Sequence, residues 1–216
     1  MTEAVRIQLI MELRRAGITD TAVLGAIERT PREVFVPTAF ANRAYDNVAL
    51  PISHGQTISQ PAVVAYMTQE LRVGVRHKVL EVGTGSGYQS AILSRLCRRL
   101  YSVERHRDLT REAETRFSLL RLKNVTTRVG DGALGWPEQA PFDRILVTAA
   151  APDVPPVLLE QLVVDGIMIV PVGEPTADQQ LIRCRRTKTS VDYETLWPVR
   201  FVPLVEGLPE AASRTG

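Results

Sequence analysis

Residues 79–88, which read VLEVGTGSGY, constrain the fold of this chain more than any other segment. Four residues typical of a buried strand lead into Gly83, Gly85 and Gly87, and a helix-forming stretch begins at Tyr88. Glycine permits a positive φ and lets another group approach the backbone closely. A strand that passes through such a turn into a helix is the first half of a βαβ unit. The segment therefore predicts an α/β fold with a ligand site at the turn.

The pattern that follows repeats this alternation of strand and helix. Short apolar runs predict parallel strands, and amphipathic stretches between them predict the crossover helices. Two further strands joined by a polar turn would form an antiparallel edge. The predicted strands are 78–82, 100–104, 125–129, 144–148, 167–171, 180–185 and 197–202, and the helices are 88–96, 108–122 and 157–163. The prediction is a three-layer sandwich with a mainly parallel sheet.

An N-terminal helical extension precedes this core. The apolar pattern predicts a helix over 4–16 and a short second helix, capped by Asp20 or Thr19, that stops at Pro31. Residues 31–60 are expected to be mostly irregular, and long ordered loops of this kind are usually functional. A helix over 61–72 follows. We expect one domain, 1–216, with N-terminal helices and an active-site loop (1–60), a cofactor-binding core (61–172), C-terminal strands (173–205) and a flexible tail (206–216).

The composition argues against nucleic-acid binding, metal binding and secretion. Lys and Arg number 26 and Asp and Glu 24, so no basic footprint for nucleic acid or anionic membrane is expected. Cys97 and Cys184 lie outside any CxxC pair and the three histidines are scattered, which predicts no metal site and no disulfide framework. Glu3, Arg6 and Glu12 interrupt the apolar N-terminus, so a signal peptide is not expected. A cytoplasmic protein with reduced thiols is the resulting expectation.

The glycine turn has an acidic partner in Glu104, which lies 21 residues after Gly83 at the end of the next predicted strand. A carboxylate there can accept hydrogen bonds from ribose hydroxyls. The dinucleotide pattern G-x-G-x-x-G fits less well, because Gly87 comes one residue early. The pattern E-x-G-x-G-x-G that starts at Glu81 instead resembles the S-adenosylmethionine motif of class I methyltransferases. We therefore favour S-adenosylmethionine in a Rossmann-like fold and keep a nicotinamide dinucleotide as the alternative.

A second acidic motif, Gly130-Asp131-Gly132, follows the third strand of the predicted sheet. By itself this motif indicates a turn. In enzymes that use S-adenosylmethionine, an acidic residue at this place commonly approaches the adenine amino group. Because it follows Glu104 in the expected order, we predict a cofactor contact at Asp131 and Gly132.

The segment after the fourth strand of this sheet, Thr148–Pro152, bears on the methyl acceptor. It has neither the [ND]-P-P-[YFW] motif of nucleic-acid amino methylators nor the Pro-Cys nucleophile of cytosine C5 methylators. It also offers no acidic metal ligand. A carboxylate, with a reference pKa of about 4, needs no general base at neutral pH. The segment therefore favours a carboxylate acceptor that is aligned and shielded from water.

Several motifs together resemble the protein-L-isoaspartate O-methyltransferase family, over about residues 30–205. The most specific are 55–61 (GQTISQP) and 148–152 (TAAAP). The others are Leu80–Gln89, Tyr101–Glu104, Gly130–Gly132 with Gly135-Trp136, Ala140–Asp143, Pro171–Gly173 and Phe201–Leu204. That family methylates the α-carboxyl of L-isoaspartyl residues in damaged proteins. The ester collapses to a succinimide, which hydrolyses partly to normal aspartate.

The resemblance implies roles for individual residues. Ser59 matches the family's active-site serine, whose hydroxyl would position the carboxylate; the alternative is that it only caps the helix over 61–72. The implied cofactor-binding residues are Thr57, Ile58, Ser59, Glu81, Gly83, Thr84, Gly85, Ser86, Gly87, Glu104, Asp131 and Gly132. The implied substrate-binding residues are Ser59, Gln60, Val202, Pro203 and Leu204. The implied partners are isoaspartyl peptides and proteins, without nucleic acid, membrane or metal, and the implied state is a monomer.

Some residues depart from the family pattern. Ser53-His54 stands where many relatives have Gly-x, Ala62 where many carry Tyr or His, and Val205 where some have Thr. Ala62 lies near the expected peptide entrance, so a carboxyl methyltransferase that tailors a biosynthetic peptide is one alternative. A non-catalytic module that binds S-adenosylmethionine is the other.

Overall fold

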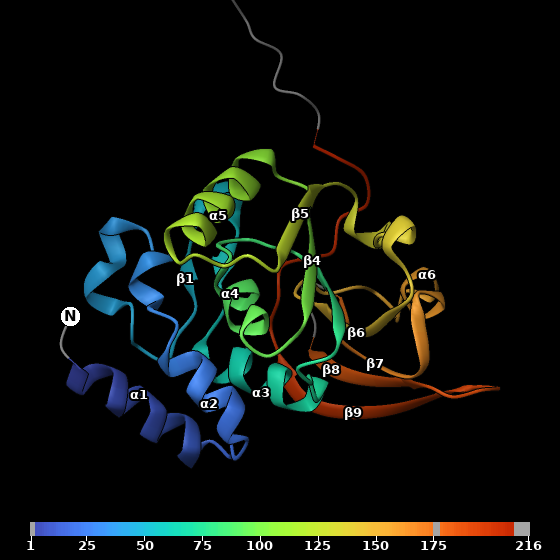
Figure 1. Ribbon diagram of the computed structural model, residues 1–216, viewed down its shortest axis with the longest axis horizontal. Helices are drawn as coiled ribbons and strands as arrows, with labels where there is room; N and C mark the ends of the chain where they lie inside the picture. Colours follow the sequence, from blue (N-terminus) through green and yellow to red (C-terminus); the bar gives the residue numbers. More distant parts are fainter. Residues whose placement is uncertain (1–2, 175–177, 210–216) are drawn as a thin grey trace, which may run out of the picture.

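The computed structural model describes residues 3–174 and 178–209. Its centre is a seven-stranded sheet in the order β5-β4-β3-β6-β7-β8-β9 (Figure 1). The strands are β3 (Lys78–Val82), β4 (Arg99–Glu104), β5 (Val125–Val129), β6 (Phe142–Val147), β7 (Leu162–Val172), β8 (Gln179–Arg186) and β9 (Val191–Val199). The first five in this order pair in parallel, and β8 and β9 form an antiparallel edge. The predicted α/β sheet is confirmed.

Helices cover both faces of the sheet. One face packs on α3 (Pro61–Leu71) and α4 (Tyr88–Ser94), and α5 (Arg107–Leu119) lies over β4 and β5. The other face packs on α6 (Pro156–Glu160) and on the turns around Trp136. Along β3, Val79 packs in the core beneath α3 and α4, and Leu80 packs in the core beneath α6, because successive side chains of a strand point to opposite faces. The parallel strands are accordingly apolar on both faces.

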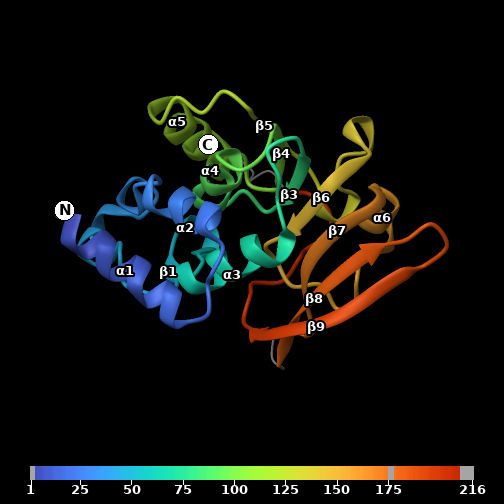
Figure 2. The ribbon, with the colours of Figure 1, turned by 60° about the horizontal axis from the view of Figure 1, so that its bottom comes forward.

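The N-terminal extension packs on α3 and α4, on the side of these helices away from the sheet (Figure 2). It consists of α1 (Glu3–Arg15) and α2 (Thr21–Glu28). Asp20, rather than Thr19, caps α2, since its Oδ1 accepts from the backbone N–H groups of Ala22 and Val23 at 2.8 and 3.1 Å. The predicted pair of helices is therefore present, with the cap resolved to the aspartate.

The segment 31–60 is more ordered than its composition indicated. Three short 3₁₀ turns occupy it, η1 (Arg32–Val34), η2 (Thr38–Arg43) and η3 (Ser53–Gly55). A two-stranded ribbon joins β1 (Leu50–Pro51) to β2 (Thr57–Ile58). Leu50 and Ile58 are buried, so this ribbon is fixed by packing as well as by hydrogen bonds. The ribbon delivers residues 57–60 to the start of α3.

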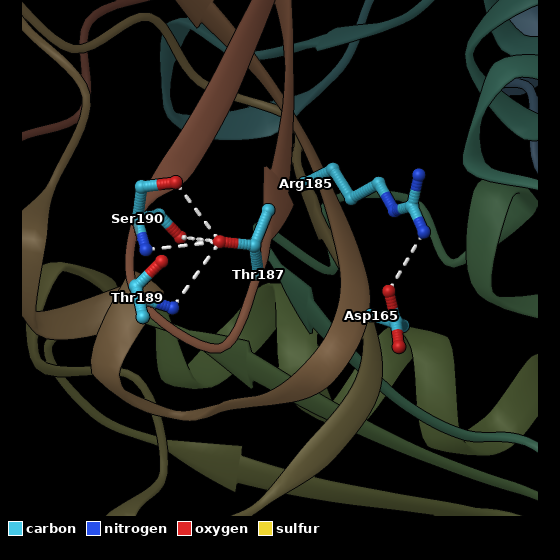
Figure 3. A network of polar contacts seen from close by, with 5 residues as sticks. All are labelled: Asp165, Arg185, Thr187, Thr189 and Ser190. Carbon is cyan, nitrogen blue, oxygen red and sulfur yellow. Dashed lines mark hydrogen bonds and ion pairs between the residues drawn. The ribbon is translucent and has the colours of Figure 1, made fainter.

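The last predicted strand needs correction. The strand expected over 197–202 is β9, which runs from Val191 to Val199, because a tight turn returns the chain directly after β8. The hydroxyl of Thr187 accepts from the N–H groups of Thr189 and Ser190, at 3.3 and 2.9 Å (Figure 3). Strand β9 therefore pairs from Arg186 opposite Val191 onward.

The helix expected over 157–163 is also shorter, ending at Glu160 as α6. The next residue, Gln161, turns its side chain to the carbonyl of Leu134 (2.9 Å) and to the N–H of Trp136 (2.8 Å). Leu162 then opens β7 opposite Phe142. The other boundaries differ from the predicted ones by a few residues.

No helix in residues 3–174 and 178–209 is long and apolar enough to cross a membrane. The single domain and its division into parts stay predictions. Of the tail expected over 206–216, residues 210–216 lie outside the described residues.

Candidate active site

A cavity of about 1070 Å³, its open mouth included, lies at the carboxyl ends of β3, β4 and β6. Ligands of open α/β sheets bind at this edge. The active-site loop, the glycine turn and the segment after β9 enclose it. Its lining consists of Gln56, Thr57, Ile58, Ser59, Val64, Met67, Val82, Gly83, Thr84, Gly85, Ser86, Tyr88, Gln89, Val103, Glu104, Arg105, His106, Gly132, Thr148, Ala149, Phe201, Val202, Pro203, Leu204 and Val205.

The glycine turn forms the floor of the cavity. Gly83 has a φ of +96°, and a Cβ at this position would lie 2.3 Å from the Oγ1 of Thr148. That hydroxyl donates to the carbonyl of Gly83 at 2.8 Å, so the turn and the end of β6 are in direct contact. Only glycine allows this approach and this backbone conformation together.

Glu104 fixes the turn from the neighbouring strand. Its Oε2 accepts from the N–H of Gly85 at 2.8 Å and its Oε1 from the N–H of His106 at 3.0 Å. The residue is 6% exposed and lines the cavity. Each carboxylate oxygen has more than one acceptor site, so further hydroxyl donors can be accommodated. This is the arrangement that recognition of a ribose diol requires.

Glu81 lies behind the turn rather than in the cavity lining. It is fully buried, and its Oε2 accepts from the hydroxyls of Ser90 and, at 2.6 Å, of Ser102. The Ser102 oxygen lies 2.6 Å from the Oγ1 of Thr84, which does line the cavity. The pKa of Glu81 is raised to about 7, chiefly by burial; the hydrogen bonds from Ser102 and Ser90 lower it, and the nearby charge of Glu104 adds a smaller upward contribution.

Two more of the predicted cofactor residues lie outside the lining. Gly87 faces α5, where an added Cβ would lie 2.8 Å from the ring of Phe117. Asp131 accepts from the N–H of Ala133 at 2.9 Å through one carboxylate oxygen and from that of Gly207 at 2.7 Å through the other. Its neighbour Gly132 does line the cavity. The structure thus gives Glu81, Gly87 and Asp131 supporting positions and brings the other predicted cofactor residues together.

Ser59 stands between the β1–β2 ribbon and α3. The residue at the N-cap of α3 is Gln60, which makes no side-chain cap hydrogen bond. The Oδ1 of Asn47 instead accepts from the N–H of Ala62, at 2.9 Å. Within the described part of the chain the Ser59 hydroxyl has no hydrogen-bond partner, so the interpretation of Ser59 as a helix cap finds no contact to support it.

The segment after β9 closes the cavity and is attached at several points. Gln179, 1% exposed, accepts from the N–H of Phe201 at 2.6 Å and donates to its carbonyl at 3.2 Å. The backbone of Ala150 pairs with Val202 at 2.8 Å and with Leu204 at 2.7 Å. The contact between Asp131 and Gly207 adds a further anchor. The predicted substrate residues Val202, Pro203 and Leu204 therefore line the cavity in a fixed segment.

A groove adjoins the cavity. Its lining shares Thr57, Ser59 and Phe201 with the cavity, and the predicted substrate residue Gln60 lies in it. The groove has a volume of about 900 Å³, its open mouth included, and runs along the end of β9. Ser59 is thus at the junction of the cavity and the groove.

Sequence reasoning missed several residues of the cavity. Tyr88, Arg105, His106 and Thr148 line it, each directly after a strand end or the glycine turn, and that position was a usable signal. Phe201 was included in a motif without a role. Its place depends on the buried Gln179, which no local pattern connects to it.

The family model of protein-L-isoaspartate(D-aspartate) O-methyltransferase matches residues 4–209, nearly the whole chain. The chain belongs to this family. The methyltransferase of Paramagnetospirillum magneticum is 62% identical over 205 residues, which cover 94% of this chain and 96% of the relative. That of Rhodospirillum rubrum is 60% identical over 94% of each chain. Both relatives are named protein-L-isoaspartate O-methyltransferase.

Solved structures give the same result for the fold. A protein-L-isoaspartate O-methyltransferase that is 27% identical aligns with a TM-score of 0.83 over 92% of this chain, which spans 65% of that longer chain. A Plasmodium falciparum protein, described as a putative member of the family in complex with S-adenosyl-L-homocysteine, is 24% identical and has a TM-score of 0.81 over 93% of this chain and 98% of its own. The Rossmann-like methyltransferase fold and the isoaspartate methyltransferase family, both predicted from sequence, are confirmed.

Proposed function

We propose that the cavity binds S-adenosylmethionine and that the chain methylates the α-carboxyl of L-isoaspartyl residues in damaged proteins, the reaction for which its family is named. The observation that carries the proposal is the position of Ser59. Its hydroxyl has no hydrogen-bond partner in the described residues, and Ser59 stands where the cavity meets the groove. A cofactor can occupy the first space while a peptide enters through the second.

The cavity residues fit S-adenosylmethionine. The cofactor supplies a methyl group on a sulfonium. Glu104 would accept the ribose hydroxyls, while the turn Gly83-Thr84-Gly85-Ser86 would present backbone groups to the methionine portion. Gly132, which lines the cavity, would border the adenine, and a Cβ at this position would lie 2.5 Å from the Cγ1 of Val82. Glu81, Gly87 and Asp131 would support this site by holding Thr84, α5 and the C-terminal segment in place.

The reacting carboxylate would be held by Ser59, whose O–H can donate to one of its oxygens. Thr57 and Ile58 would wall one side of it, and Val202 to Leu204 the other, with Gln60 beside the peptide. The carboxylate attacks as it stands, because at neutral pH it is already ionised. The residues therefore orient the carboxylate and have no proton to remove.

Exclusion of water would raise the rate further. Charge disappears as a carboxylate and a sulfonium react to give a neutral ester and a neutral thioether, so shielding both from water favours the reaction. Val82, Val103, Phe201 and Leu204 supply apolar surface around the cavity. The attached segment after β9 keeps two of these side chains in place.

The alternatives kept open by the sequence are not favoured. A nicotinamide enzyme, a tailoring methyltransferase and a non-catalytic module would each have to arise among relatives that are 60% identical and named for isoaspartate methylation. We further propose that the protein acts as a monomer in the cytoplasm. The support for that compartment is that Cys97 and Cys184 are free thiols, as expected in a reducing environment.

Product analysis tests the proposal. An isoaspartyl peptide incubated with the protein and S-adenosylmethionine should yield in turn the methyl ester, the succinimide and a mixture of aspartyl and isoaspartyl peptides, resolved by chromatography and mass spectrometry. A protein that binds the cofactor but leaves the isoaspartyl peptide unchanged would refute the proposal. S-adenosylhomocysteine added in excess is the control, and it should suppress the ester, the succinimide and the aspartyl peptide while the isoaspartyl peptide persists.

A further inference from the structure

The groove beside Ser59 carries a single charged side chain. Of the residues that line it, Arg200 alone is charged, and the others include Ala49, Gln60, Val63 and Pro198. From this we infer that Arg200 is a specificity-determining residue, which favours isoaspartyl peptides that carry a second carboxylate near the isoaspartyl residue. The inference rests on the proposed function, since it concerns the peptide that this function methylates.

Arg200 differs from the neighbouring arginines of the hairpin in having no partner. Arg183 pairs with Glu70 and Glu194, and Arg185 pairs with Asp165 at 2.7 Å (Figure 3). Across residues 3–174 and 178–209, no carboxylate lies within ion-pair distance of Arg200 and no hydrogen bond engages it. The side chain is exposed. Its guanidinium is therefore available to an anion from outside the chain.

The backbone holds Arg200 at the groove. The next residue, Phe201, has both its N–H and its carbonyl bound by the buried side chain of Gln179. The preceding residue, Val199, ends β9 and pairs with Gln179 in the sheet. The side chain of Arg200 thus starts from a fixed point on the groove wall.

The peptide path leads past this point. The groove and the cavity share Thr57, Ser59 and Phe201, so a peptide whose reacting carboxyl lies at Ser59 has the groove as its continuation. Each extended residue spans about 3.3–3.6 Å, so the residues that flank the isoaspartate are the ones that reach the groove. The rest of the groove lining is uncharged, so no negative charge in the groove opposes the attraction of an anion to Arg200.

A guanidinium binds a carboxylate through two parallel hydrogen bonds. The carboxylate could come from the side chain of a flanking Asp or Glu or from the peptide's own C-terminus. Because Arg200 is exposed, the expected preference is modest, about two- to five-fold in kcat/KM, and carried mainly by KM. It should weaken as salt is raised.

The test uses isoaspartyl peptides of one length that differ only in a flanking Glu or Gln and in a free or amidated C-terminus. For each protein, kcat/KM is expressed as the ratio of Glu to Gln peptide and of free to amidated peptide. These ratios cancel any general loss of activity. The proteins are the wild type, Arg200→Gln and the matched control Arg185→Gln, which removes an exposed arginine of β8 that lies outside the groove.

The wild type and the Arg185→Gln control should show at least one ratio of about two to five at low salt, and the Arg200→Gln variant should show both near one. The ratio that exceeds one identifies the source of the carboxylate. Ratios near one in the wild type, or ratios that survive in Arg200→Gln, would overturn the inference while leaving the proposed function intact. Absence of methylation on every isoaspartyl peptide would overturn the proposed function and the inference with it.

Discussion

Replacing Glu81 with Gln should make the protein more stable at alkaline pH. Glu81 is fully buried, and burial raises its pKa from an ordinary value of 4.5 to about 7. The folded protein therefore binds this proton more tightly than the unfolded chain. The stabilising contribution is fully present below about pH 4.5 and is lost as the pH rises through about 7. Above that range the protein carries a buried charge whose cost the Gln variant does not have.

The magnitude follows from the difference in pKa. One pKa unit corresponds to about 1.4 kcal/mol, so a difference of about 2.5 gives about 3 kcal/mol in total. Between pH 5 and 8.5 the free energy of unfolding of Glu81→Gln should gain about 2.5 kcal/mol on that of the wild type. In a chain of this size that corresponds to a relative rise in Tm of roughly 5–10 °C. The hydroxyls of Ser90 and Ser102 can rotate to bond the amide, so the packing is preserved.

Urea unfolding at several pH values, without cofactor, measures this difference. The informative quantity is the change in the gap between the two proteins, because a constant offset would report only how well the amide packs. Glu28→Gln, an exposed change at the end of α2, is the control and should stay within about 0.5 kcal/mol of the wild type at each pH. Curves for Glu81→Gln and wild type that run parallel from pH 5 to 8.5 would refute the reasoning.

Three further changes test how the site is built. Asn47→Ala removes the acceptor at the start of α3 and should cost about 1 kcal/mol, a fall of about 2–4 °C in Tm by calorimetry; an unchanged Tm would contradict the capping role. Gly83→Ala should weaken cofactor binding by calorimetric titration, and adding Thr148→Ala should restore part of it by removing the 2.3 Å contact; no restoration would mean that the contact is not the cause. Gln179→Leu leaves the backbone of Phe201 unpaired, which should cost about 1–3 kcal/mol and raise the KM for peptide more than that for cofactor; equal effects on both would count against it.

The parallel half of the fold could be predicted from the sequence. Strands β3, β4 and β5 are buried or half-buried runs with amphipathic helices between them, and this pattern is local. Strand β9 could not be placed as well. It is an edge strand whose first residues, such as Asp192 and Glu194, are exposed, so their composition resembled a loop. Its start is set by the hydrogen bonds of Thr187 in the turn.

The candidate site likewise has features that the sequence could predict and features that it could not. The glycine turn and Glu104 were predictable because their spacing is fixed by one strand, one turn and the next strand. The sequence could not distinguish residues that line the cavity from residues that support it from behind, because Glu81 and Asp131 share motifs with residues that face the cavity. Their side chains turn instead to Ser102 and to Gly207, contacts that only the folded chain creates.

The roles of Asn47, Gln179 and Arg200 were also beyond the sequence. Each of the first two acts on a backbone group well separated from it in the sequence, at Ala62 and at Phe201. The sequence could identify them as polar residues but gave no indication of their partners. Arg200 became distinctive only when the neighbouring arginines proved to be paired.

The most direct test of the whole account is the rate of methyl transfer to two synthetic peptides that differ only in one isoaspartyl or aspartyl linkage. With labelled S-adenosylmethionine, the wild type should form a base-labile ester on the isoaspartyl peptide alone. Ser59→Ala should lower kcat/KM on that peptide by about 10²-fold, because the carboxylate loses the hydroxyl that orients it. Equal methylation of both peptides, or an undiminished rate in Ser59→Ala, would contradict the assignment of this pocket to isoaspartyl recognition.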